Sequence, residues 1–307
     1  MYYFIVNKHS RTGKGGDIWK LLKKKLEEKQ VDYKAYISEY AGHAFLLADK
    51  VCGEAKQDEC LIVVGGDGTV NEVVNGMKNF DKIRFGLIAT GSGNDFGRGL
   101  GVEKDPLMQL EHLLASTKEE GIDLGKVTYG EKEESRLFAI SAGIGMDAIV
   151  CKKALTSKLK KVLNALHLGK LTYLIITVET LFSMTTASGT ACYDEGELQN
   201  FQKMIFAAAM NFRAEGGGVP MAPSASATDG KLSVCLTNGI PKWLTFFCLP
   251  FLVAAKHERI KGFQITNCKT CELQLDVPMV LHADGEYCGD VRDVKFECLE
   301  GMLRVMR

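Results

Sequence analysis

The chain has 307 residues, of which 46% are hydrophobic and 25% charged, which predicts a globular protein with a large core and two domains. Acidic and basic residues balance at 38 each, so we expect no nucleic-acid partner, and the absence of a run of about 20 apolar residues predicts no transmembrane helix. The 10 cysteines show no repeating spacing, and the lone pair Cys268 and Cys271 lacks a second pair or histidine nearby, so we expect reduced thiols rather than a zinc site.

The first predicted elements alternate between strands and helices. Residues 2–6 and 33–38 are predicted to form strands, and residues 43–54 a helix. Residues 18–29 are predicted to form an amphipathic helix whose inward side chains are Leu21, Leu22 and Leu26.

The polar, glycine-rich loop of residues 7–16 follows the first strand and carries Arg11 and Lys14. It is not a Walker A motif, because Gly15 rather than a serine or threonine follows Lys14. Two interpretations stay open at this point, namely a loop that contacts phosphate and a solvated basic turn.

The most informative stretch is a strand that passes through a glycine turn into a helix. Residues 61–64 are apolar, and residues 65–68, which are three glycines and Asp67, end that strand. Helical spacing then follows at Val70, Val73, Val74 and Met77. Such a junction directs bare backbone N–H groups and a helix dipole at one spot, which favours a phosphate ligand. Because a carboxylate repels phosphate, Asp67 indicates a cation such as Mg²⁺ between them.

A second glycine loop, residues 90–98, follows the strand predicted at residues 83–88, and a helix is predicted at 107–114. Strands that alternate with helices predict an α/β domain with a parallel sheet. Both glycine loops leave the carboxyl ends of strands, where such sheets bind ligands.

From Asp123 onward the pattern changes to short alternating runs, which predict an antiparallel sheet or sandwich. These runs are residues 137–142, 189–193, 203–210, 231–237, 263–267, 270–275, 294–299 and 303–306. Two apolar segments interrupt them. Residues 155–182 open with a helical stripe among lysines, and residues 243–255 either line a lipid-tail pocket or, as we prefer, fill the edge of the sandwich.

Four motifs together resemble the diacylglycerol kinase catalytic-domain family, which includes sphingosine and ceramide kinases. They are residues 65–72, residues 91–96, the Asp229–Gly230 pair and the stretch from Asp284 to Glu286. The length and layout most resemble the soluble bacterial lipid kinases of this family. The resemblance implies a two-domain fold like that of NAD kinases and diacylglycerol kinases. An α/β nucleotide-binding domain would span residues 1–125. A C-terminal antiparallel β-sandwich for the lipid would span residues 126–307, whose last residues return to the first domain.

The resemblance also implies a nucleotide site for ATP. Its first loop departs from the family pattern, because Lys8 stands where a proline is usual. The implied nucleotide-binding residues are Asn7, Ser10, Arg11, Ser38, Gly65, Gly66, Asp67, Gly68, Thr69, Asn71, Glu72, Ser92, Gly93 and Asn94.

Two cation sites follow from the same resemblance. Asp67, Asp95 and Asp123 match acids that organise the Mg²⁺ of the nucleotide. Asp229, with Ser226 and Lys231 beside it, resembles a structural Mg²⁺ site in the second domain.

The resemblance assigns catalysis to Asp284 and Glu286, together with Asp67. Phosphoryl transfer needs a group that takes the proton of the attacking hydroxyl, and either Asp284 or Glu286 can do so. Taken alone, an Asp-Gly pair is equally typical of a hairpin turn. His282 lies close by in the sequence, and we interpret it as a structural histidine.

We therefore expect an ATP-dependent lipid kinase that phosphorylates a primary hydroxyl, diacylglycerol being the first choice and phosphatidic acid its product. The alternatives are a NAD kinase and a non-catalytic lipid-binding module of the same fold. We expect a cytoplasmic protein that associates peripherally and transiently with an anionic membrane surface. The expected contact is the lysine-rich stretch 152–161, for which a helix that packs on the core with a solvated basic face is the open alternative. A homodimer is also left open.

Overall fold

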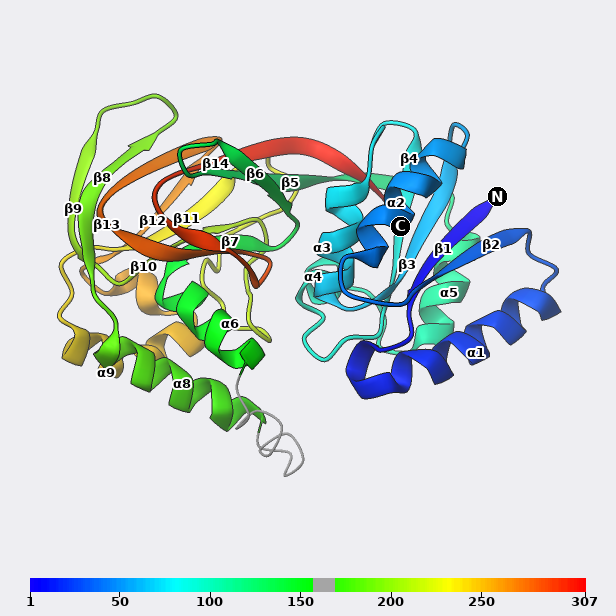
Figure 1. Cartoon of the computed structure of the whole chain (residues 1–307), viewed down its shortest axis with the longest axis horizontal. Helices are drawn as coiled ribbons and strands as arrows, with labels where there is room; N and C mark the ends of the chain where they lie inside the picture. Colours follow the sequence, from blue (N-terminus) through cyan, green and yellow to red (C-terminus); the bar gives the residue numbers. More distant parts are fainter. Residues whose placement is uncertain (157–168) are drawn as a thin grey trace.

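The computed structural model describes residues 1–156 and 169–307, which form two parts connected by long strands (Figure 1). In the first part the strands are parallel, as the sequence predicts, and they pair in the order β2-β1-β3-β4. Their bounds are β1 Tyr2–Asn7, β2 Tyr33–Ser38, β3 Glu59–Gly65 and β4 Ile83–Ala89.

Helices cover both faces of this sheet because successive strand side chains point to opposite sides. Phe4 and Val6 join one core cluster, and Tyr3 and Ile5 the other. The face of Phe4 is covered by α1 Lys14–Glu28, which follows the short 3₁₀ turn η1 Ser10–Gly13, and by α5 Pro106–Ala115 (Figure 1). The face of Tyr3 is covered by α2 His43–Glu54, α3 Asp67–Gly76 and α4 Asp95–Leu100.

The inward face of α1 differs from the prediction at one position. Leu22 and Leu26 are buried as expected, but Leu21 is 58% exposed. Trp19 is buried in its place and packs on Phe4, with ring centroids 5.6 Å apart. The prediction considered only the leucines of this helix, whereas in the structure the larger side chain of Trp19 faces the sheet.

The second part is antiparallel and sandwich-like, as the sequence predicts, around a core of its own. In the described residues, its strands continue from the first sheet in the order β4-β14-β13-β7-β10-β11-β12, and β5, β6, β8 and β9 pair off this path. Their bounds are β5 Glu119–Tyr129, β6 Glu134–Phe138, β7 Ser141–Gly145, β8 Ala187–Tyr193, β9 Gln199–Met204, β10 Phe206–Met210, β11 Leu232–Thr237, β12 Phe263–Cys268, β13 Thr270–Ala283 and β14 Glu286–Met306.

Four predicted strands were wrong in extent. The run 137–142 divides into β6 and β7, because the backbone N–H groups of Ala139 and Ile140 donate to the carboxylate of Asp284 instead of a neighbouring strand. The run 203–210 divides at Ile205, whose N–H donates to the Thr237 hydroxyl. Conversely, the runs 294–299 and 303–306 are one strand, β14, with an irregularity opposite β5.

Strand β14 returns the end of the chain to the first part, where Val305 pairs in parallel with Phe85 of β4. Strand β5 pairs along β14 and runs through residues 125 and 126, where the sequence places the domain boundary. Both strands therefore belong to the connection between the two parts.

Three helices lie together on the outer side of the second part, namely α6 Met146–Thr156, α8 Gly169–Ser183 and α9 Lys242–Val253 (Figure 1). The expectation that residues 243–255 fill the sandwich edge was wrong. Only Thr245, Cys248 and Leu252 of α9 are buried, and most of its large apolar side chains face solvent. No helix within the described residues has both the length and the apolarity needed to cross a bilayer.

The lysine-rich stretch is only partly described. Lys152 lies 3.8 Å from Asp290, and Lys153 lies 2.8 Å from Glu179 of α8, so both are paired with acids. The other predicted members lie outside the described residues, namely the side chain of Leu155, and Lys158, Leu159, Lys160, Lys161, Val162 and Leu166.

Asn211 is a buried amide that binds the second part together. Its Nδ2 donates to the carbonyls of Asp123 and Ala139, at 2.6 and 2.8 Å. We expect Asn211→Ala to lower the free energy of unfolding by about 2 kcal/mol or more, because it leaves two carbonyls without this donor. Urea unfolding measures the effect. The control Asn200→Ala, at an exposed position of β9, should change stability by less than about 0.5 kcal/mol, and equal effects of the two variants would contradict this role.

Candidate active site

The two glycine loops lie against each other with no space for side chains. A Cβ atom on Gly66 would lie 2.9 Å from the Cα of Gly91, and one on Gly91 would lie 2.7 Å from the Cα of Gly66. This approach explains why both loops require glycine here. It also places the start of α3 next to the end of β4, so one ligand can contact both loops.

The first polar loop is fixed to this centre by side-chain hydrogen bonds. The Asn7 amide donates to the Thr69 hydroxyl at 2.9 Å, and the hydroxyls of Ser10 and Thr90 are 2.7 Å apart. The carboxylate of Glu72 accepts from the N–H groups of Gly42 and Ala44 at the start of α2. These contacts bring three segments of the chain to the carboxyl ends of the parallel strands.

A cavity of about 640 Å³ lies at this edge. Most of the residues that the sequence assigns to the nucleotide line it, namely Asn7, Ser10, Arg11, Ser38, Gly66, Asp67, Gly68, Thr69, Glu72, Ser92 and Gly93. Tyr40 adds a ring to the wall and stacks on His43, with centroids 4.6 Å apart.

Three other residues of that assignment lie behind the cavity wall. Gly65 accepts a hydrogen bond from the N–H of Thr90, and Asn94 starts α4 in a left-handed conformation while its amide donates to Gly91. Asn71 points the other way, and its amide donates to Asp284 at 2.8 Å. These residues shape the site from behind rather than facing the cavity.

Asp67 lies at the floor of the cavity between the two loops. Its carboxylate accepts from the N–H groups of Asp95 and Phe96, each at 3.1 Å. Burial raises the pKa of Asp67, these two hydrogen bonds lower it, and the nearby carboxylates of Asp95 and Asp284 raise it again. A cation at this point would relieve the repulsion between the acids.

Asp95 connects this floor to the second part. It is only 6% exposed, it pairs with Arg98, and it accepts the N–H of Gly217 at 2.7 Å. Gly217 belongs to the glycine-rich loop that follows β10, so Asp95 connects Asp67 and the glycine loops to a loop of the other part.

Asp284 is the most heavily hydrogen-bonded acid of the site. It accepts from the N–H groups of Ala139, Ile140 and Ser141 and from the Asn71 amide, at distances between 2.8 and 3.1 Å. Its burial raises its pKa, although these donors lower it in part. Asp284 therefore clamps α3 of the first part to the β6–β7 connection of the second.

Glu286 stands in a different environment, two residues further on. It is half-buried at the start of β14, and its Oε1 lies 3.6 Å from the point where a Cβ on Gly68 would be. The turn that Asp284 anchors thus directs the Glu286 carboxylate to Gly68 at the start of α3.

Asp123 lies with the residues of the second predicted cation site. Its two carboxylate oxygens accept from the N–H groups of Gly230 and Gly301, at 2.8 and 2.6 Å. Burial raises its pKa, and the charges of Asp229 and Glu300 raise it further. Asp229 accepts the N–H of Lys231, and the Ser226 hydroxyl lies 3.2 Å from that of Thr228. The structure therefore groups Asp123 with Asp229, whereas Asp67 lies with Asp95.

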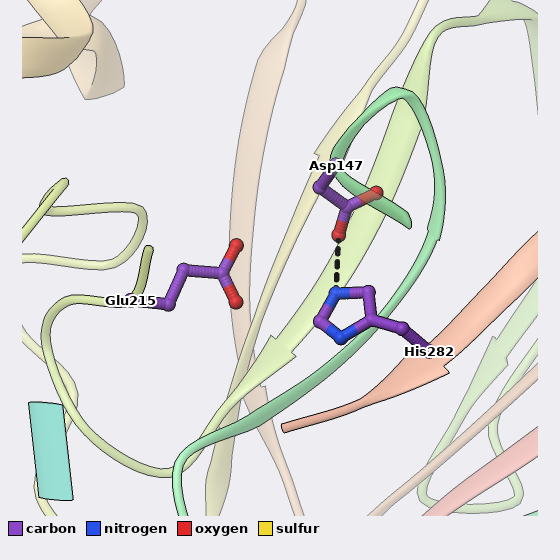
Figure 2. Close-up of side chains that lie close together, drawn as sticks. All are labelled: Asp147, Glu215 and His282. Atoms are coloured by element: carbon purple, nitrogen blue, oxygen red, sulfur yellow. Dashed lines mark hydrogen bonds and ion pairs between the residues drawn. The ribbon is translucent and has the colours of Figure 1, made fainter. Parts of the chain in front are cut away.

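Beside the Asp284 turn is a group that the sequence did not predict, formed by the buried His282 and the partly buried Asp147 and Glu215 (Figure 2). His282 Nδ1 accepts the N–H of Gly285 at 3.0 Å, so its proton lies on Nε2, 3.2 Å from the Asp147 carboxylate. Burial alone lowers the pKa of His282, but the contact with Asp147 raises it above its usual value. Burial raises the pKa of Glu215 to about 7.

This protonation state argues against a metal ion on His282. A metal at Nε2 would need its proton on Nδ1, where the N–H of Gly285 already donates. The histidine instead supports the Asp284–Gly285 turn, which is the structural role expected from the sequence. A signal for Glu215 was present in the three glycines that follow it, whereas Asp147 stands in an ordinary apolar context.

Comparisons with known proteins agree with this geometry. Residues 1–127 match the family described as Diacylglycerol kinase catalytic domain, and residues 140–307 match the YegS C-terminal NAD kinase beta sandwich-like domain. The "Putative lipid kinase YtlR" of Bacillus subtilis is 30% identical over 94% of this chain and 94% of its own length. The Diacylglycerol kinase of the same organism is 29% identical over 76% of this chain and 73% of its own.

A solved structure from Bacillus anthracis, titled a "putative diacylglycerol kinase", has the same fold. It superposes with a TM-score of 0.75 at 20% identity and covers 99% of this chain and 96% of that one. With both parts matched in order, the chain belongs to the diacylglycerol kinase catalytic-domain family and carries the YegS-type C-terminal domain.

Proposed function

We propose that this chain is an ATP-dependent lipid kinase that transfers the γ-phosphoryl group to a primary hydroxyl of a lipid. Family membership supports phosphotransferase activity and the use of ATP. Diacylglycerol is the acceptor that the names of its relatives indicate, and phosphatidic acid would be the product. The observation that carries the proposal is the position of the Glu286 carboxylate beside Gly68, which joins the acid turn to the phosphate loop.

The nucleotide would bind in the cavity with its phosphates at the start of α3. Gly66 precedes that helix and leaves its first N–H groups without a side-chain cap, and the positive end of the helix dipole favours an anion there. The cavity continues to Ser38 and Tyr40, which provides a wall for the rest of the nucleotide.

Asp67 and Asp95 would hold the Mg²⁺ that accompanies ATP. Their carboxylate oxygens suit this hard cation. Burial and the nearby carboxylates of Asp95 and Asp284 raise the pKa of Asp67, and a cation would relieve the repulsion between these acids. Because a hydrogen-bond donor already contacts each oxygen of both carboxylates, contact through water fits them well. When bound, Mg²⁺ neutralises phosphate charge during transfer.

A second cation would lie in the other part, beside Asp229. Ser226 and Lys231 flank this acid, and Asp123 and Glu300 add negative charge around it. We assign Asp123 to this structural site because its contacts lie there.

Glu286 is the better candidate for the base, and Asp284 for its anchor. The Asp284 oxygens accept four hydrogen bonds inside the protein, which leaves them poorly placed to approach a substrate. Glu286 is half-buried and faces the phosphate loop, so it can accept the proton of an incoming hydroxyl. Since ATP is cytoplasmic and the acceptor is a membrane lipid, the reaction would take place at the cytoplasmic face of a membrane.

Acceptor specificity is the first test. With radiolabelled ATP, we expect label in phosphatidic acid when diacylglycerol is supplied, and less with a long-chain base, ceramide or phosphatidylglycerol. NAD serves as the non-lipid acceptor. Label in NAD phosphate but in no lipid would show a NAD kinase. If no label from ATP reached any of these acceptors, the proposal would be contradicted.

The two acids of the turn should differ in the kind of damage that their loss causes. Glu286→Gln should lower kcat by about 10²-fold or more with near-normal ATP affinity, because it removes proton transfer but not the fold. Asp284→Asn should also lower the unfolding temperature, since an amide replaces an acceptor of four hydrogen bonds.

Activity, ATP affinity and thermal unfolding are measured on each variant. The matched control is Glu131→Gln, which lies in an exposed turn and should behave as wild type. A Glu286→Gln protein that keeps most of its kcat would show that the base lies elsewhere.

Asp67 should matter through the cation. We expect Asp67→Asn to lower kcat by about 10²-fold or more and to raise the Mg²⁺ concentration needed for half-maximal rate. The control is Asp81→Asn, an exposed acid that precedes β4, whereas the second glycine loop follows the other end of that strand. An unchanged Mg²⁺ requirement in a folded Asp67→Asn protein would refute the assignment.

A further inference from the structure

Helix α9 presents an apolar face to solvent. Trp243, Phe247 and Val253 are 61%, 60% and 68% exposed, and Phe251 is 50% exposed. Its buried side is small and partly polar, consisting of Thr245, Cys248 and Leu252. This is the reverse of an ordinary surface helix, whose large apolar side chains face the core.

The apolar surface continues onto α8. Phe182 is 55% exposed, and its ring centroid lies 6.4 Å from that of Phe246 on α9. The two helices lie side by side on the outer side of the second part (Figure 1). We call this surface the α9 face, and it consists of Phe182, Trp243, Leu244, Phe246, Phe247, Phe251 and Val253.

A basic border follows the end of α9. Lys256, Arg259 and Lys261 are all exposed within six positions, with Glu258 as the single acid among them. Within the part of the chain that the structure describes, none of the three forms an ion pair with an acid. In a chain with zero net charge, this is a local positive edge on an apolar surface.

The same side of the molecule leads to the catalytic turn. Helix α6 begins beside His282 through Asp147, and Lys153 of α6 pairs with Glu179 of α8 at 2.8 Å. Contacts between aromatic rings then connect α8 to α9. A lipid delivered at the α9 face would therefore approach the second part on the side of α6. The first turn of α6 carries Asp147, which contacts His282 behind the Asp284–Gly285 turn.

We propose that the α9 face docks on an anionic bilayer, with its aromatic side chains in the interfacial region and Lys256, Arg259 and Lys261 against the headgroups. The helix has 12 residues, about 18 Å, so it lies in the interface rather than crossing it. That the bilayer supplies the lipid substrate rests on the proposed kinase function. The docking itself is measured without ATP.

The chain contains two tryptophans, which gives a direct probe. Trp243 is 61% exposed and Trp19 only 6%. In a Trp19→Phe protein, vesicles of phosphatidylcholine with phosphatidylglycerol should shift the Trp243 emission to the blue, and brominated acyl chains should quench it. Vesicles of phosphatidylcholine alone should have a weaker effect.

Three variants then separate the two components in vesicle sedimentation. Replacement of Trp243, Phe247 and Phe251 by Gln should lower partitioning by about 10-fold or more at every salt concentration. Replacement of Lys256, Arg259 and Lys261 by Gln should lower it by about fivefold per charge on anionic vesicles at low salt. The matched control replaces Leu21, Leu46 and Met108, which are exposed apolar residues of the first part, and should bind as wild type.

Activity on a short-chain, water-soluble diacylglycerol keeps the two proposals apart. The α9 variants should retain it while losing turnover on vesicles. Equal vesicle binding by wild type and the aromatic variant would overturn the docking proposal. So would a wild type that ignores vesicles but forms dimers that the aromatic variant does not, because the α9 face would then be an interface between copies of the chain. No activity on the soluble acceptor, with vesicle binding intact, would overturn the kinase proposal alone.

Discussion

The arrangement of the site depends on the hydrogen bonds that the Asp284 carboxylate accepts. It receives three backbone N–H groups from the β6–β7 connection and the Asn71 amide from α3. A buried carboxylate is costly unless its oxygens are satisfied, and here donors from both parts of the chain satisfy them. The two parts are thus held in one relative position at the point where nucleotide and acceptor would meet. Arg136 strengthens this link because its guanidinium donates two hydrogen bonds to the side-chain oxygen Oδ1 of Asn71.

The site also concentrates negative charge, and each acid is handled differently. Backbone N–H groups satisfy Asp67, Arg98 partly neutralises Asp95, and internal donors surround Asp284. Burial raises the pKa of Asp67, and the repulsion that remains from Asp95 and Asp284 raises it further. Such a site favours a cation over a bare anion, which is consistent with a nucleotide that arrives with Mg²⁺. The glycines contribute shape instead of charge, since only glycine allows the approach of Gly66 to Gly91.

The turn that carries Glu286 is supported from behind. His282 accepts the N–H of Gly285 at Nδ1 and donates from Nε2 to Asp147, so two hydrogen bonds of one buried histidine orient the backbone of this turn. Glu215 approaches the same histidine from a loop whose Gly217 also donates to Asp95 (Figure 2). Asp95 and the turn of Glu286 are therefore connected through one set of polar contacts.

Local patterns in the sequence determined the parallel strands, most helices and the two glycine loops. Helical spacing identified Val70, Val73 and Val74 as buried, because such spacing places them on one face. Spacing does not say which face another element covers. For that reason we expected Leu21 to face the core, where the structure has Trp19. We also expected the aromatic residues of α9 to be buried, whereas most of them face solvent.

The tertiary structure alone decided how distant residues meet. Asp123 lies 107 positions from Gly230, and Asn71 lies 213 positions from Asp284, yet each pair shares a hydrogen bond. No local pattern records such contacts, because strand order and the return of β14 to the first part create them. The same holds for the distinction between Asp284 and Glu286. Both acids belong to one motif in the sequence. Only their surroundings separate Asp284, whose oxygens accept four internal hydrogen bonds, from Glu286, which lies beside Gly68.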